Sequence, residues 1–230
     1  MEQSFYLQTS LGEIYTCFKP SQIKKLIIMV HGVAGTRNSI FFRQIPFQSQ
    51  FATVRFDFLG QGRSEGEIYF SYSYLVQQLE ELLTDKIFQE YTEKIFIGHS
   101  KGATVSMFVA KKYETVIAIA PRFFLNQFYG MTQTQIQEIR LGKTLFPIFG
   151  GKKIKFSKQD LIELENYDLH QLLSLKMLKL IVIGGKNDDI ASYDHIQEYQ
   201  QYGQIYYYDY GHFDFEIDCL NQLTYILGIN

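Results

Sequence analysis

Serine, aspartate and histidine side chains occur in this sequence in an order that could support nucleophilic acyl transfer. The segment 98–102, GHSKG, has the pattern G-x-S-x-G, with Ser100 at its centre. A serine hydroxyl attacks a carbonyl carbon effectively only when a base removes its proton, and near neutral pH histidine suits that task. A carboxylate on the far side of the histidine fixes its tautomer and stabilises the imidazolium. Chemistry at Ser100 therefore requires a histidine and a carboxylate elsewhere in the chain.

The candidate base is one of five histidines, which are His31, His99, His170, His195 and His212. The first two precede the serine, whereas folds that use this motif supply the acid and then the base after the nucleophile. The third lies in a polar insertion and the fourth in a polar stretch with helical character. His212 follows the last candidate strand, so it would lie at the carboxyl edge of a sheet beside Ser100. Its alternative role is that of an ordinary loop histidine.

The candidate acid lies in the segment LIVIGGKNDDIAS, residues 180–192, which offers both Asp188 and Asp189 directly after an apolar strand. Either carboxylate could accept the second ring proton of the histidine. A surface turn that carries two aspartates is the alternative interpretation.

Two glycine-containing loops complete the pattern. HGVAG, residues 31–35, follows the apolar run LIIMV, and we predict that the backbone N–H groups of Val33 and Lys101 form an oxyanion hole. His31 is predicted to brace this loop through hydrogen bonds. The second loop, DFLGQGRS at 57–64, lacks both G-x-G-x-x-G spacing and the lysine of a phosphate-binding loop, so we predict a structural role.

Elements of two kinds alternate along the chain and would position these residues. Six short apolar runs are typical of buried parallel strands, and they cover residues 26–30, 52–56, 94–97, 116–120, 180–183 and 205–208. Helical periodicity covers residues 74–88 and 103–112. The alternation predicts a mostly parallel, doubly wound α/β sheet. The first twenty residues, with a turn at 10–12, predict an antiparallel hairpin at the edge of the sheet.

Residues 121–177 interrupt this rhythm because they contain no convincing strand. An insertion of that length between two strands is more often a functional lid than a plain connection. We predict a cap at 121–177 within one domain of residues 1–230. Its aromatic residues indicate either an apolar pocket or a local core, and they are Phe123, Phe124, Phe128, Tyr129, Phe146 and Phe149.

Composition excludes several other classes of protein. A net charge of −2, with 46% hydrophobic and 20% charged residues, gives no field that would attract nucleic acid or an anionic membrane. The basic cluster of Lys152, Lys153 and Lys155 is predicted to be solvated. The only cysteines, Cys17 and Cys219, form no zinc or disulfide pattern. We expect no membrane span, no signal peptide and a cytoplasmic location.

These segments together resemble the α/β-hydrolase superfamily, and within it the small cinnamoyl/feruloyl esterases and monoacylglycerol-lipase-like esterases. The resemblance rests on HGVAGTRNS (31–39), RFDFLGQGRSEG (55–66), GHSKG (98–102), GGKNDD (184–189) and GH (211–212). It implies an oxyanion hole at Val33 and Lys101, and it assigns the acid to Asp188 rather than Asp189. The serine-containing turn GHSKG, which we call the elbow, departs from the family pattern at Lys101, where such esterases usually carry glutamine or methionine.

The resulting prediction is a serine esterase that acts on a small-molecule ester through Ser100, His212 and Asp188, without a metal or organic cofactor. A thioesterase, peptidase or acyltransferase with the same three residues is an alternative. A non-catalytic ligand-binding protein on the same scaffold is another. The sequence does not favour one oligomeric state, and the weakly matching cap leaves the acyl group unnamed.

Overall fold

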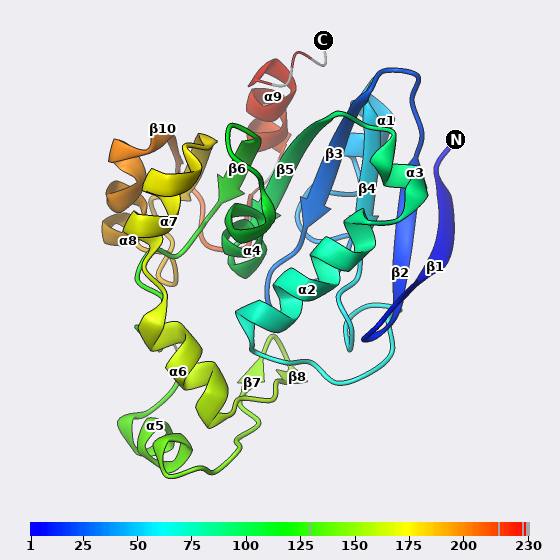
Figure 1. The fold of residues 1–230 in the computed structure, drawn as a ribbon. Helices are drawn as coiled ribbons and strands as arrows, with labels where there is room; N and C mark the ends of the chain where they lie inside the picture. Colours follow the sequence, from blue (N-terminus) through cyan, green and yellow to red (C-terminus); the bar gives the residue numbers. More distant parts are fainter. Residues whose placement is uncertain (129, 216, 227, 229–230) are drawn as a thin grey trace.

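The computed structural model describes all residues except 129, 216, 227, 229 and 230. Its main feature is an eight-stranded sheet in the order β1-β2-β4-β3-β5-β6-β9-β10 (Figure 1). The strands are β1 (Gln3–Thr9), β2 (Gly12–Lys19), β3 (Lys25–Val30), β4 (Ala52–Phe56), β5 (Glu93–His99), β6 (Thr115–Ile119), β9 (Lys179–Gly185) and β10 (Gly203–Tyr208). The helices are α1 (Ile45–Gln48), α2 (Tyr72–Leu83), α3 (Lys86–Gln89), α4 (Lys101–Val109), α5 (Gln133–Arg140), α6 (Lys158–Asn166), α7 (Leu169–Lys176), α8 (Tyr193–Gln197) and α9 (Ile217–Ile226), with a 3₁₀ turn at Glu198–Gln201.

The six predicted parallel strands are confirmed. Strands β4, β3, β5, β6, β9 and β10 pair in parallel, and each overlaps one of the apolar runs. Alternation along β3 explains why these runs are apolar on both faces. Leu26, Ile28 and Val30 pack in a core that includes side chains of α2 and α4. Ile27 and Met29 pack in a second core with side chains of α1 and α9. The sheet is thus covered on both faces, as parallel sheets require.

The predicted N-terminal hairpin is also confirmed. Strands β1 and β2 pair antiparallel, with Thr9 opposite Gly12 across the turn. Strand β2 then pairs antiparallel with β4, so the hairpin forms one edge of the sheet.

The prediction of one continuous helix at 74–88 is wrong. The structure has two helices, because α2 ends at Leu83 and α3 begins at Lys86. The carboxylate of Asp85 accepts a hydrogen bond from the backbone N–H of Ile87 and so caps the start of α3. An aspartate side chain competes in this way with helix continuation. The helix predicted at 103–112 begins earlier, at Lys101, and ends at Val109.

In the predicted cap, residues 121–177, the part that holds α5, α6, β7 (Ile148–Phe149) and β8 (Lys152–Lys153) projects beyond one end of the sheet, whereas α7 does not (Figure 1). The prediction that this segment holds no strand is wrong, because β7 pairs antiparallel with β8. These two-residue strands flank Gly150 and Gly151, whose φ angles of 52° and 75° suit a tight glycine turn. Strands this short carry too little periodicity to be recognised in the sequence.

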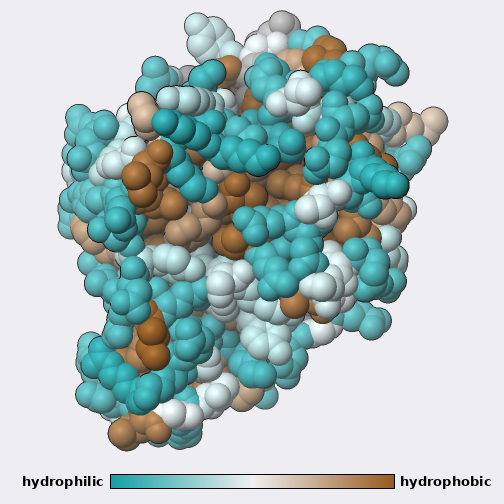
Figure 2. Space-filling model, in the orientation of Figure 1, coloured by the Kyte–Doolittle hydropathy of each residue, from teal (hydrophilic) through white to brown (hydrophobic). Residues whose placement is uncertain are grey.

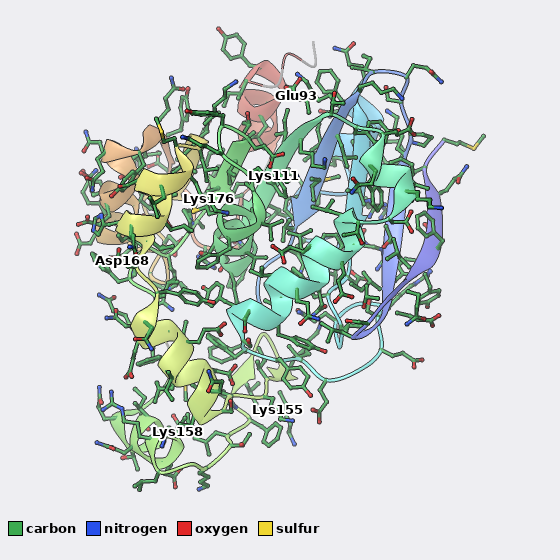
Figure 3. The ribbon with its side chains drawn as sticks, viewed as in Figure 1. Glu93, Lys111, Lys155, Lys158, Asp168 and Lys176 are labelled. Carbon is green, nitrogen blue, oxygen red and sulfur yellow. The ribbon has the colours of Figure 1, made fainter. Side chains whose placement is uncertain are left out.

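Two lysines of the segment 121–177 contact residues outside it. Lys155 forms an ion pair of 3.1 Å with Glu67, outside the cap. At the other end of the segment, the ammonium group of Lys176 donates hydrogen bonds to the backbone oxygens of Phe108 and Ala110, at the end of α4 (Figure 3). The return of the chain from the cap is therefore held against the helix that follows Ser100.

The surface in the view of Figure 2 is mostly hydrophilic, with apolar side chains gathered near its middle, over α2 and α4. Partly buried residues of these helices, including Val76 and Phe108, pack against the core below. Among the residues that the structure describes, no helix is long and apolar enough to span a bilayer.

Candidate active site

Ser100 lies in a strained turn between β5 and α4. Its φ of 53° and ψ of −123° lie outside the regions favoured by residues with a side chain. The turn is possible because the flanking glycines allow very close packing. A Cβ atom at Gly98 would lie 2.4 Å from the Cα of Ala103, and one at Gly102 would lie 2.2 Å from the backbone oxygen of Val30. Both distances are too short for any other residue.

Three predicted side chains meet at this turn and form a continuous hydrogen-bonded series. The Nε2 atom of His212 lies 2.8 Å from the Oγ of Ser100, and its Nδ1 lies 2.8 Å from Oδ2 of Asp188. The side chains of His212 and Asp188 are 4% and 0% exposed. Elements far apart in the sequence supply them, because Ser100 follows β5, Asp188 follows β9 and His212 follows β10. All three strands end at the same edge of the parallel sheet.

Asp188 is the carboxylate that bonds to the ring of His212. Its second oxygen, Oδ1, accepts hydrogen bonds from the backbone N–H groups of Ile190 and Ala191, at 2.9 and 2.8 Å. Burial would raise the pKa of Asp188, but the hydrogen bonds from His212 and the two amides outweigh it and lower the pKa below its usual value. The carboxylate thus stays ionised and can stabilise an imidazolium.

His99 has a role in the site that the sequence analysis did not identify. Its Nε2 donates a hydrogen bond of 2.8 Å to the backbone oxygen of His212. Burial lowers the pKa of His99 to about 4, so its ring is neutral near pH 7. No signal in the sequence marks this contact, because the position before the serine in the motif G-x-S-x-G tolerates many residue types.

His31 braces the loop after β3, as predicted. Its Nδ1 donates to the backbone oxygen of Gly32 at 2.8 Å, while its Nε2 accepts from the backbone N–H of Phe58 at 3.1 Å. Burial lowers the pKa of His31 to about 4. The ring therefore serves as a neutral connection between two loops.

The two predicted oxyanion donors border the same pocket as the serine. A Cβ atom at Gly32 would lie 3.0 Å from the Cβ of Ser100, so the loop that carries Val33 passes directly beside Ser100. Lys101 is the first residue of α4, and its N–H has no acceptor within the helix. Both residues line the pocket with Ser100 and His212.

The pocket has a volume of about 580 Å³. Its walls come from both the sheet edge and the cap, and most of its lining is apolar. Among the aromatic residues singled out in the cap, Phe128 and Phe149 line the pocket, whereas Phe123, Phe124 and Phe146 do not. Tyr129 lies outside the described residues. No group of three or more potential metal ligands occurs in the described part of the chain.

The remaining histidines lie away from the serine. His195 accepts hydrogen bonds at Nδ1 from the backbone N–H groups of Phe123 and Phe124. His170, in the cap, lies 2.8 Å from the hydroxyl of Tyr202.

This sheet, with a strained serine after its central strand and a cap over the pocket, defines an α/β hydrolase. The sequence model of one family within that class, described as serine aminopeptidase, S33, matches residues 21–183. The chain belongs to this family. The matched region includes Ser100 and ends before Asp188 and His212.

Solved structures of similar fold cover nearly the entire chain. The α/β hydrolase domain-containing protein 10 from mouse is 16% identical, with 98% of this chain and 97% of that chain covered and a TM-score of 0.76. The Pyrococcus furiosus esterase Pf2001 is 15% identical, with 100% and 91% covered and a TM-score of 0.71. The thioesterase domain from the curacin biosynthetic pathway is 13% identical, with 99% of both chains covered and a TM-score of 0.68. No curated protein sequence matches the chain.

The buried histidines predict that acid destabilises the fold. His31, His99 and His195 have folded-state pKa values lowered to about 4, below the ordinary value of 6.5. Between these values the unfolded chain binds protons that the folded chain does not, so stability falls as the pH drops through this range. Each histidine contributes a slope of roughly 1.4 kcal/mol per pH unit.

We therefore expect the free energy of unfolding, measured in urea, to fall by about 3–5 kcal/mol between pH 7 and pH 5. The variant His99→Gln should show a shallower slope, whereas His170→Gln, at a half-exposed side chain, should not. A stability that is constant over this range would contradict the prediction.

Proposed function

We propose that this protein is a serine hydrolase that cleaves carboxylic esters through an acyl-enzyme on Ser100. The observation that carries the proposal is the series of two 2.8 Å hydrogen bonds from Ser100 through His212 to Asp188. A binding protein has no need of a strained, pocket-facing serine that contacts a buried histidine–aspartate pair. Strain of this kind persists where function requires it.

The mechanism has two half-reactions. His212 takes the hydroxyl proton of Ser100 as the oxygen attacks the ester carbonyl, and the backbone N–H groups of Val33 and Lys101 stabilise the resulting oxyanion. The imidazolium, held by Asp188, then protonates the leaving alcohol. Water, deprotonated by His212, attacks the acyl-enzyme, and Ser100 leaves with its proton restored.

We propose an ester as the substrate because most of the pocket lining is apolar and provides surface for an acyl chain. The Pyrococcus esterase and the curacin thioesterase domain have the same fold, which is compatible with cleavage of an ester or a thioester. Thioester cleavage, peptide cleavage and acyl transfer remain alternatives with the same three residues. Buried free cysteines at Cys17 and Cys219 fit the predicted cytoplasmic location.

The proposal is tested by labelling with a fluorophosphonate probe, which reacts covalently with activated serines. We expect wild-type protein to be labelled stoichiometrically and Ser100→Ala not at all. The matched control is Ser174→Ala, at an exposed position of α7, which should label fully. Parallel assays with p-nitrophenyl butyrate, butyryl-CoA and an aminoacyl anilide then compare ester, thioester and amide. Failure of the wild-type protein to label would refute the proposal.

A further inference from the structure

Two cationic side chains, Lys101 and Arg122, line the candidate catalytic pocket. Lys101 is 6% exposed and extends from the start of α4. Arg122 is half-buried and follows β6, at the beginning of the cap. Neither forms an ion pair within the described residues. The mechanism uses only the backbone N–H of Lys101 and no part of Arg122, so it leaves both charges unexplained.

The ammonium group of Lys101 has no hydrogen-bond partner in the described part of the chain. It lies 3.6 Å from the ring centre of Phe70 and 4.3 Å from that of Tyr72, in cation–π contact with both. Burial lowers the pKa of Lys101 to about 7, with Asp160 and Glu163 opposing the shift. Such a group is protonated more readily when an anion is beside it.

The two carboxylates whose charges raise the pKa of Lys101 form hydrogen bonds with other groups. Asp160 accepts hydrogen bonds from the backbone N–H and hydroxyl of Ser157 at the start of α6. Glu163 accepts hydrogen bonds from the backbone N–H groups of Tyr72 and Ser73 and from the hydroxyl of Tyr167. They weaken the positive potential at Lys101 without pairing with it.

Among the described residues, Arg122 donates hydrogen bonds only to neutral groups. Its Nη2 donates to the backbone oxygens of Phe124 and Gln127, and its Nε is buried with no partner among the described residues. Its charge also opposes protonation of Lys101, which places the two cations within electrostatic reach of each other.

Buried charges in proteins are normally paired, because removing an ion from water without a partner is costly. Repulsion between the two unpaired cations in this pocket raises that cost further. We propose that the Lys101–Arg122 side of the pocket binds a carboxylate of the substrate, so that the preferred substrate is an ester that also carries a free carboxylate. The inference rests on the proposed function, whose site it specifies further. Most of the pocket lining is apolar, which suits the hydrocarbon part of such an ester.

The first test compares hydrolysis of matched esters with and without a carboxylate. Monoethyl adipate is paired with ethyl hexanoate, which places the carboxylate in the acyl half. The butyrate ester of 4-hydroxybutyrate is paired with butyl butyrate, which places the carboxylate in the alcohol half. We expect kcat/KM for the anionic member of one pair to exceed that of its neutral partner by about tenfold or more at pH 7. The pair that shows the preference identifies the half of the substrate that faces the cations.

Variants then test whether the cations cause the preference. Arg122→Met should lower the anionic-to-neutral ratio of kcat/KM by about tenfold or more, and Arg122→Lys should retain part of it. Lys153→Met removes an exposed cap lysine that does not line the pocket, and it should leave the ratio unchanged. Both values of kcat/KM are measured on the same sample of each variant, so partial loss of folded protein lowers both equally and leaves their ratio unchanged.

A binding measurement separates this inference from the proposed function. Calorimetric titration of Ser100→Ala should show about tenfold or tighter binding of the preferred anionic ester than of its neutral partner. The additional change Arg122→Met should remove the difference. Equal binding of both esters, or a neutral preference in hydrolysis that still depends on Ser100, would overturn the inference and leave the proposed function intact. Absence of hydrolysis together with selective anion binding would refute the esterase and support the carboxylate site.

Discussion

Replacing His212 by glutamine should lower kcat for p-nitrophenyl butyrate by about 10⁴-fold or more. The reason is that Ser100 then has no group to take its proton, although the pocket and the candidate oxyanion donors remain. Asp188→Asn should cost a similar factor, because an amide in place of the carboxylate favours the wrong histidine tautomer and does not stabilise the imidazolium.

The double variant separates a cooperative unit from independent contributions. If the residues act in series, His212→Gln combined with Asp188→Asn should be little slower than His212→Gln alone. The control His170→Gln changes a half-exposed histidine that contacts Tyr202 and Glu198, and it should keep kcat near the wild-type value. Wild-type turnover by His212→Gln would exclude this histidine as the base.

Replacing Asp57 by alanine should destabilise the fold by about 3–5 kcal/mol, because it leaves a partly buried cation without its partner. The Asp57 side chain is 0% exposed, and its Oδ2 forms an ion pair with the guanidinium of Arg37. It also accepts hydrogen bonds from the backbone N–H groups of Arg37 and Arg63, at 2.7 and 2.9 Å. Turnover should fall as well, because Arg37 follows the loop that carries Val33.

The measurement is the urea midpoint at pH 7, with unchanged m-value as evidence that only stability is affected. Asp57→Asn keeps an acceptor oxygen and should cost less than alanine. As a control, Glu138→Ala removes one partner of an exposed ion pair with Lys143 and should cost under about 1 kcal/mol. A loss at Asp57 as small as this control would show that the buried carboxylate contributes little.

The strands and the elbow were predictable from the sequence because their signals are local. Apolar runs such as 52–56 read as strands wherever they occur, and GHSKG needs only a strand before it and a helix after it. The proximity of Ser100, Asp188 and His212 followed from chain order, since the ends of parallel strands meet at one edge. Their catalytic roles stay predictions.

Other features depended on contacts that the sequence does not reveal. The break at Thr84 and Asp85 is a local competition between helix continuation and capping, which periodicity alone does not settle. The β7–β8 hairpin is too short to leave a pattern. The positions of Lys101 and Arg122 on one pocket wall depend on how the cap folds back, and burial of a lysine at the start of a helix contradicts its usual exposure.

The hydrogen bond from His99 to the carbonyl of His212 joins residues 113 positions apart. It anchors the segment that carries His212 to the end of the strand that precedes Ser100. The orientation of the imidazole therefore depends on the residue that immediately precedes the serine. Position 99, at which the motif allows any residue, thus helps to orient His212. A side chain at this position that donates no hydrogen bond would displace the imidazole of His212 rather than the hydroxyl of Ser100.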